Sequence, residues 1–176
     1  PIQEKGVIIP NPITSNLPYW NEKSLEKTII TASRLTKQKN LPMLINAFSK
    51  ILEKYPEYKL KIFGVGELRD KLQTHIEQLG LDNKVIMPGF SNNIHSEMVN
   101  SDLFIISSDY EGISNSMLEA LAIGVPVIST DSPIGGARMF IKSGENGMLI
   151  KVGATDELVK NINKVLSDKE LAISLS

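Results

Sequence analysis

The sequence predicts an α/β fold: a doubly wound, mainly parallel Rossmann-like sheet with helices on both faces. Short β-branched runs such as 28–32 alternate with longer stretches of helical spacing such as 41–52. The connections between them are short, which favours repeated strand–helix units joined by right-handed crossovers. No linker or low-complexity tract divides the 176 residues, so we expect residues 1–176 to form one domain.

Composition excludes several classes of protein. Hydrophobic residues make up 41% of the chain and charged residues 22%, as in globular proteins. The net charge of −1 gives no basic excess, so we expect no nucleic-acid partner. The chain has no cysteine, which excludes disulfides and fits the cytoplasm. No apolar run reaches the roughly 20 residues of a membrane helix. Because the chain starts at Pro1 and stops within helix-like sequence, we expect it to be part of a longer protein.

The first third of the chain gives two strands and one helix. Residues 7–9 form a short β-type run that a Pro-Asn-Pro sequence ends. Residues 13–27 are polar and weakly patterned, which indicates a surface connection. The uncharged run 28–32 is typical of a strand buried on both faces. A helix over 41–52 follows, with Asn40 as a plausible N-cap.

The middle and last parts continue the alternation. Residues 59–63 and 85–87 read as strands, and the helix at 68–79 between them stops at Gly80. The remaining expected elements are helices at 92–100, 115–123, 137–141 and 155–166, and strands at 103–106, 126–129 and 148–150. Thr155 is the expected N-cap of the last helix, and carboxylates in its first turn suit the helix dipole.

Two cations follow the strand at 28–32. Arg34 and Lys39 lie in the sequence SRLTKQKN, so they would flank the mouth of the sheet. Arginine can grip phosphate oxygens with two hydrogen bonds, and lysine acts as a mobile point charge. Position alone leaves a phosphate site and two solvated loop cations equally plausible.

Two carboxylates stand eight positions apart, around the start of the helix at 115–123. Glu111 precedes this helix and Glu119 lies within it, at the sheet edge where open α/β folds bind ligands. The helix N-terminus there would suit a diphosphate, and a carboxylate would suit ribose hydroxyls. The competing interpretation is structural, because Ser116 and Glu119 fit a capping box.

Other motifs are weaker. The Gly64-Val65-Gly66 turn lacks the third glycine of a dinucleotide fingerprint, because Arg69 stands there, so a tight turn is favoured. Gly136, in a Gly-Gly pair, precedes a helical stretch and could admit an anion. His75 and His95 lie among polar residues and are expected at the surface. No cluster has metal-ligand spacing, so we expect no metal site.

Taken together, several stretches resemble one family. The ordered set comprises PNPI at 10–13, ASRLTKQKN at 32–40, IFGVGE at 62–67, VIMPGF at 85–90, SDLFIISSDYEG at 101–112, SNSMLEALAIGVPVIST at 114–130, GGAR at 135–138 and GENGMLI at 144–150. The set, which includes a Glu-x7-Glu motif, is similar to the C-terminal, nucleotide-sugar-binding domain of retaining glycosyltransferases of family four. These enzymes have the GT-B fold, and the whole pattern resembles the bacterial members that build capsular or other surface polysaccharides.

The resemblance implies roles for matching residues. Arg34 and Lys39 would neutralise the donor diphosphate, Glu111 would contact the transferred sugar, and Glu119 would hold the ribose. Backbone amides at Asn115 and Ser116 would meet phosphate; the base would lie near Phe90, and Gly136 would line the donor site. The chain departs from the family pattern at Ser33, Asn40 and Ile113. It also has Ala137-Arg138-Met139 where many members have Pro-Arg-Glu or Pro-Glu-Glu.

The resemblance also implies partners. The donor would be a nucleotide diphosphate sugar, with UDP-sugar favoured, and no metal or other cofactor would be needed. A preceding domain, absent from this chain, would bind a glycan or lipid-linked acceptor, so the chain alone should be inactive. The full-length enzyme would lie in the cytoplasm, either free or bound peripherally to the inner face of the membrane. The alternatives are a nicotinamide-dependent oxidoreductase domain and a non-catalytic nucleotide-binding module; a sugar phosphorylase or epimerase is a nearer competitor.

Overall fold

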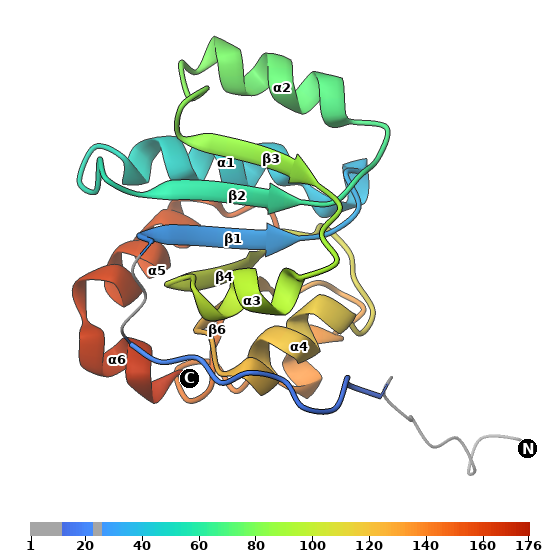
Figure 1. The fold of residues 1–176 in the computed structure, drawn as a ribbon, viewed down its shortest axis with the longest axis vertical. Helices are drawn as coiled ribbons and strands as arrows, with labels where there is room; N and C mark the ends of the chain where they lie inside the picture. The colour runs from blue at the N-terminus through green and yellow to red at the C-terminus, as the bar shows by residue number, and fades with distance from the viewer. Residues whose placement is uncertain (1–11, 23–25) are drawn as a thin grey trace, which may run out of the picture.

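A computed structural model describes residues 12–22 and 26–176, which form a six-stranded sheet covered by helices on both faces (Figure 1). The strands are β1 (Thr28–Ala32), β2 (Lys59–Phe63), β3 (Val85–Gly89), β4 (Leu103–Ile106), β5 (Val127–Thr130) and β6 (Met148–Ile150). Their order is β3-β2-β1-β4-β5-β6, and every neighbouring pair is parallel. The predicted doubly wound parallel sheet is confirmed.

The helices divide between the two faces. They are α1 (Leu41–Ile51), α2 (Arg69–Gln78), α3 (Ile94–Val99), α4 (Asn115–Ile123), α5 (Thr155–Ser167) and α6 (Lys169–Ser174), with short 3-10 turns at Lys37–Lys39 and Ala137–Met139. In Figure 1, α3 and α4 lie in front of the sheet while α1 and α5 lie behind it. Each face therefore has its own apolar core.

Adjacent strand residues supply these two cores. Ile29 packs in the core with α1 and α5, and the next residue, Ile30, packs in the core with α3 and α4. Phe104 and Ile105 of β4 divide in the same way. Successive side chains of a strand point to opposite faces, so a central strand covered on both sides carries few charged or polar side chains. This explains why the runs in β1 and β4 lack the polar alternation of half-exposed strands.

Several helix boundaries differ from the sequence-based expectation. Asn40 does precede α1, but its side chain makes no capping hydrogen bond, and its backbone is left-handed. Thr155 is the first residue of α5 rather than its N-cap, which is Ala154. The helix expected at 137–141 is only the 3-10 turn Ala137–Met139. Gly80 follows the end of α2 with a φ of 66°, as expected of a terminating glycine.

The segment before β1 is more than a surface connection. The Trp20 indole donates a hydrogen bond of 2.7 Å to the Ser101 carbonyl, and the Trp20 backbone N–H donates to the Ile123 carbonyl at 2.8 Å. These contacts tie residues 12–22 to the face of the sheet that carries α4. The strand expected at 7–9 lies outside the described residues. Within the described parts of the chain, no helix is long and apolar enough to cross a membrane.

Candidate functional site

The strand order places the candidate site. It reverses between β1 and β4, because the chain runs outward through β2 and β3 and then crosses back to β4. Open α/β sheets bind ligands beyond the carboxyl ends of the strands at such a switch point. The loops that follow β1 and β4 carry the predicted cations and Glu111, so the fold brings them to one edge.

Hydrogen bonds join these two loops directly. The Ser107 hydroxyl donates to the Lys39 carbonyl at 2.7 Å, and the Asp109 N–H donates to the Gln38 carbonyl at 2.9 Å. The Asn40 side-chain amide donates to the Asp109 carboxylate at 2.6 Å. Asn40 therefore stabilises the loop pair instead of capping α1, which explains a polar residue at this position.

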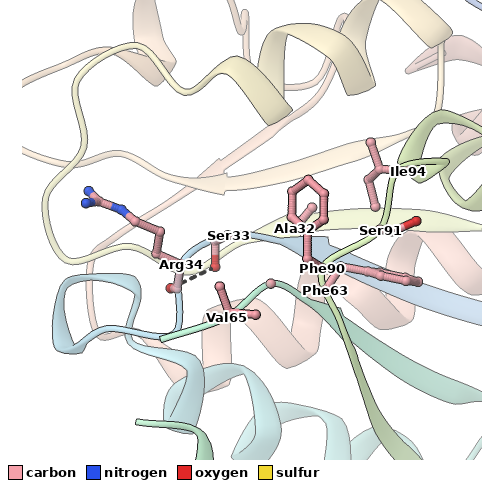
Figure 2. Close-up of a pocket in the computed structure, with 9 residues that line it drawn as sticks. Ala32, Ser33, Arg34, Phe63, Val65, Phe90, Ser91 and Ile94 are labelled. Carbon is pink, nitrogen blue, oxygen red and sulfur yellow. Dashed lines mark hydrogen bonds between the residues drawn. The ribbon is translucent and has the colours of Figure 1, made fainter. Parts of the chain in front are cut away.

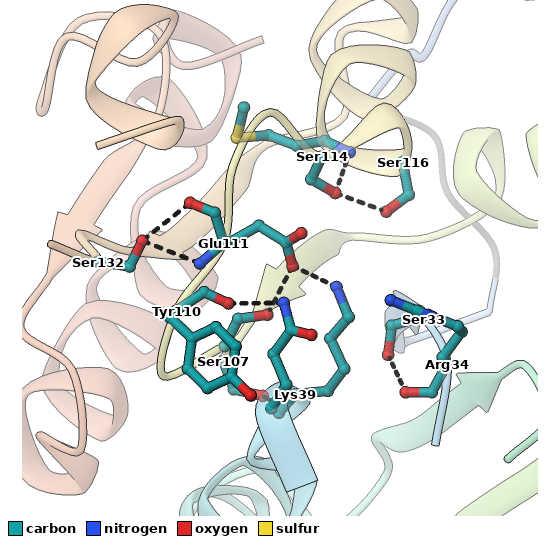
Figure 3. A network of polar contacts seen from close by, with 12 residues as sticks. Ser33, Arg34, Lys39, Ser107, Tyr110, Glu111, Ser114, Ser116 and Ser132 are labelled. Carbon is teal, nitrogen blue, oxygen red and sulfur yellow. Dashed lines mark hydrogen bonds and ion pairs between the residues drawn. The ribbon is translucent and has the colours of Figure 1, made fainter. Parts of the chain in front are cut away.

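Lys39 and Glu111 form an ion pair at the centre of the site (Figure 3). Their side chains are only 12% and 19% exposed. The Ser108 hydroxyl donates to the same carboxylate oxygen at 3.0 Å. The Ser132 hydroxyl lies 3.1 Å from both the backbone N–H and the carbonyl of Glu111, which fixes the backbone of this loop. Two residues predicted to bind different parts of a ligand are thus paired with each other.

Helix α4 begins beside this ion pair. Its N-cap is Ser114, whose hydroxyl accepts a hydrogen bond of 3.4 Å from the Met117 N–H. The predicted Ser116 cap is wrong, because Ser116 is already helical; its hydroxyl lies 3.1 Å from that of Ser114. Since Ser116 does not cap, the capping box does not explain Glu119. The first-turn amides of α4, which include those of Asn115 and Ser116, lie at the positive end of the helix dipole.

Two adjoining hollows lie at this edge of the sheet, and both are lined by Ala32 and Ser33. The larger has a volume of about 260 Å³ and runs from Arg34 to an apolar end formed by Phe63, Phe90 and Ile94 (Figure 2). Phe90 is 74% exposed, so the face of its ring is accessible to a flat ligand. The smaller hollow has a mixed lining, in which Leu41 and Ile106 are apolar and the polar members include Lys39, Ser107, Ser108, Ser114 and Ser116.

Arg34 points away from the apolar end of the larger hollow (Figure 2). Its side chain is exposed, and no ion pair of Arg34 occurs among residues 12–22 and 26–176. An exposed cation without an ion pair, at the edge of the larger hollow, suits an anionic ligand. The two predicted cations therefore differ: Lys39 is paired with Glu111, whereas Arg34 has no ion pair among the described residues.

Three glycines allow backbone segments to approach each other closely. A Cβ on Gly64 would lie 1.8 Å from the Ser33 carbonyl oxygen, and one on Gly66 would lie 2.4 Å from the Leu35 carbonyl oxygen. The Gly64-Val65-Gly66 segment therefore runs close beside Ser33 and Leu35, and the turn favoured from the sequence lies just after it, at residues 67–68. A Cβ on Gly136 would lie 1.7 Å from the Gly112 carbonyl oxygen. Gly136 is thus required for packing the loop that carries Glu111, whatever it contributes to a ligand.

Glu119 faces a residue that the sequence assigned to the surface. His95, on α3, is half-buried, and its Nε2 atom lies 3.4 Å from the Glu119 carboxylate. The two residues are 24 positions apart on different helices, so no local spacing pointed to the contact. His75 is also half-buried and contacts the Asn46 side chain at 2.8 Å. Both histidines are thus partly exposed and make specific polar contacts, and their expected lack of a role as bases stays a prediction.

The described part of the chain contains no group of three or more His, Cys, Asp or Glu side chains arranged to hold a metal ion. The charges that the site offers a ligand are those of Arg34, Lys39, Glu111 and Glu119, together with the dipole of α4.

Comparison with known proteins identifies the family to which the chain belongs. The family model described as "Glycosyl transferases group 1" matches residues 15–176. An N-acetylgalactosamine-N,N'-diacetylbacillosaminyl-diphospho-undecaprenol 4-alpha-N-acetylgalactosaminyltransferase of Campylobacter jejuni is 34% identical over 146 residues. That alignment covers 83% of this chain and 39% of the relative, so the chain spans about two fifths of that enzyme.

Solved structures also resemble the chain. Anabaena Alr3699/HepE, crystallised with UDP and glucose, is 28% identical with a TM-score of 0.79, covering 85% of this chain and 41% of that chain. The C-terminal domain of a glycosyl transferase group 1 family protein (LpcC) from Francisella tularensis is 26% identical with a TM-score of 0.81, covering 93% of this chain and 92% of that chain. The chain belongs to the group 1 glycosyl transferases, and its fold is the Rossmann-like half of a GT-B structure.

Proposed function

We propose that this chain is the donor-binding domain of a retaining glycosyltransferase and that it binds a nucleotide diphosphate sugar, with UDP as the nucleotide. The observation that carries the proposal is the convergence of Arg34, Lys39 and the start of α4 at the β1–β4 switch point. Two cations and a helix N-terminus provide the charge that a diphosphate requires. The UDP in the HepE complex, on a chain 28% identical to this one, supports the choice of nucleotide.

The two hollows match the parts of such a ligand. The exposed ring of Phe90 would stack on the base, and the carboxylate of Glu119 would accept hydrogen bonds from the ribose hydroxyls. The diphosphate would lie between Arg34 and Lys39, on the backbone amides of Asn115 and Ser116. The transferred sugar would extend toward Glu111, which is the residue paired with Lys39, and toward Gly136.

The chemistry follows from where charge develops. In the proposed reaction the glycosidic bond to the diphosphate breaks, and negative charge grows on the departing phosphate oxygens. Arg34, Lys39 and the dipole of α4 would stabilise that charge, and such preorganised stabilisation is usually the largest contribution to catalysis. These groups supply positive charge without a bound cation, so we propose that donor binding needs no metal.

We further propose that the acceptor site lies in a preceding domain, because the chain spans only part of its relatives. The name of the Campylobacter relative points to a lipid-linked glycan acceptor, which would place the full-length enzyme in the cytoplasm and at the inner face of the membrane. The isolated chain should then bind donor without turnover. Sugar transfer by residues 1–176 alone would contradict this division.

Protection against thermal unfolding tests the proposed ligand. UDP at about 100 times its Kd should stabilise the chain by about 2.7 kcal/mol, which is an increase of about 5–10 °C in Tm for a domain of this size. NAD at the same concentration should give a much smaller shift, because Arg69 stands where the fingerprint needs its third glycine. A larger shift with NAD than with UDP would favour an oxidoreductase domain, and no shift with either would favour a module with another ligand.

The Lys39–Glu111 ion pair leads to a second prediction, which concerns the affinity for UDP. Glu111→Gln should raise UDP affinity by about two- to fivefold, because the lysine ammonium no longer has a competing carboxylate and a negative charge beside the diphosphate is removed. Affinity for UDP-sugar should rise less, since the sugar loses a charged hydrogen-bond acceptor. Isothermal titration of the variant with UDP, UDP-glucose and uridine measures all three; weaker UDP binding would show that Glu111 supports Lys39 rather than competing with the diphosphate.

A further inference from the structure

His95 and Glu119 lie on two helices that pack against each other, α3 and α4. The His95 Nε2 atom is 3.4 Å from a carboxylate oxygen of Glu119, close enough for an ion pair. The same nitrogen is shielded from solvent and has no hydrogen-bond partner of good geometry. The side chains are 27% and 24% exposed, so the contact lies at the border of the site rather than in bulk water.

This geometry decides which ring nitrogen carries a proton. A lone pair on Nε2 would face a carboxylate oxygen and repel it, whereas an N–H there would be attracted. A buried donor without a partner is costly, so a slight rotation of the carboxylate toward His95 is favourable. The second carboxylate oxygen then remains for another donor.

The charged neighbours of His95 are otherwise engaged. Glu97, on the same helix, accepts a hydrogen bond of 2.9 Å from Lys61, and Lys61 also donates to Glu26 at 2.7 Å. Glu119 has no ion pair with a lysine or arginine among the described residues, and its contact is with His95. Among the ion pairs of the described residues, none joins His95 or Glu119 to the Lys61 cluster.

We infer that His95 is a positioning residue for Glu119: its Nε2–H holds one carboxylate oxygen so that the other accepts hydrogen bonds from the cis-diol of a ribose. The preceding residue, Ile94, lines the apolar end of the larger hollow together with Phe90. Helix α3 would therefore link the base pocket to the ribose carboxylate. This inference rests on the proposed function, because it presumes that Glu119 binds the nucleotide.

The test compares ligands that differ only in the diol. His95→Ala should lower the affinity of the chain for UDP by about tenfold, as expected for the loss of a hydrogen bond to a charged group. It should leave the affinity for 2′,3′-dideoxy-UDP unchanged, because that ligand cannot use the carboxylate. His95→Gln, whose amide can donate from a similar position, should recover most of the UDP affinity. Isothermal titration measures each constant.

The outcomes separate this inference from the proposed function. If the unsubstituted chain does not bind UDP, the proposed function falls and the inference falls with it. If the chain binds UDP but His95→Ala weakens UDP and dideoxy-UDP equally, His95 supports the fold of α3 and not the ribose contact. Failure of His95→Gln to recover UDP affinity while remaining folded would also overturn the inference.

Discussion

Replacing Arg34 with alanine should lower the UDP affinity of this chain by about 10- to 100-fold and leave its uridine affinity nearly unchanged. A charge-assisted hydrogen bond contributes about 1.5–3 kcal/mol, and each 1.4 kcal/mol is about tenfold in Kd. Uridine has no phosphate, so it cannot lose this contact. The Arg34 guanidinium is exposed and without an ion pair among the described residues, so its removal should leave the stability of the domain intact.

The neighbouring Lys37 provides the matched control. Lys37→Ala removes one positive charge from the same loop, at a side chain that is also exposed. It should change UDP affinity by less than about twofold at physiological salt, because a screened surface charge contributes little. Equal losses in the two variants would reduce the role of Arg34 to general electrostatic attraction, and equal losses for UDP and uridine in Arg34→Ala would remove it from the diphosphate site.

Gly136→Ala should cost about 3 kcal/mol or more of stability and disturb the site as well. The added Cβ would lie 1.7 Å from the Gly112 carbonyl oxygen and 2.9 Å from the Ile113 nitrogen, so a backbone segment must move. Overpacking of this kind costs about 1–3 kcal/mol and occasionally more. The displaced segment adjoins Glu111 and the start of α4, so UDP affinity should fall in parallel. Urea unfolding gives the stability.

Gly112 is the control, because it is the other member of the same contact. A Cβ on Gly112 would have no atom within 4 Å, and its φ is not in the left-handed region. Gly112→Ala should therefore change the free energy of unfolding by less than about 1 kcal/mol. If both variants lose the same stability, the close approach of the two loops does not explain why residue 136 is glycine.

The sheet could be predicted from the sequence because burial on both faces leaves a clear pattern. The strands expected at 28–32 and 103–106 match β1 and β4, since a covered central strand tolerates few charged residues. The strand expected at 59–63 also matches β2, although Lys59 and Lys61 alternate there with buried residues. The site residues were found by their motifs, and the order of the strands then brought them to one edge. The predicted roles of these residues remain predictions.

What the sequence could not predict depends on contacts between distant residues. Ser114 rather than Ser116 caps α4 because of where the loop turns into the helix, and both residues suit a cap. The Lys39–Glu111 and His95–Glu119 contacts join elements that are far apart in the chain, so no local periodicity reveals them. These contacts hold the side chains of the site in place.

A crystal structure of this chain with UDP tests the central claim most directly. We expect the diphosphate between Arg34, Lys39 and the first turn of α4, the ribose hydroxyls on Glu119 and the base against Phe90. The Lys39–Glu111 ion pair should be broken or lengthened, because the lysine turns to the phosphates. UDP bound away from the β1–β4 edge, or bound there with its diphosphate remote from both cations, would contradict the account.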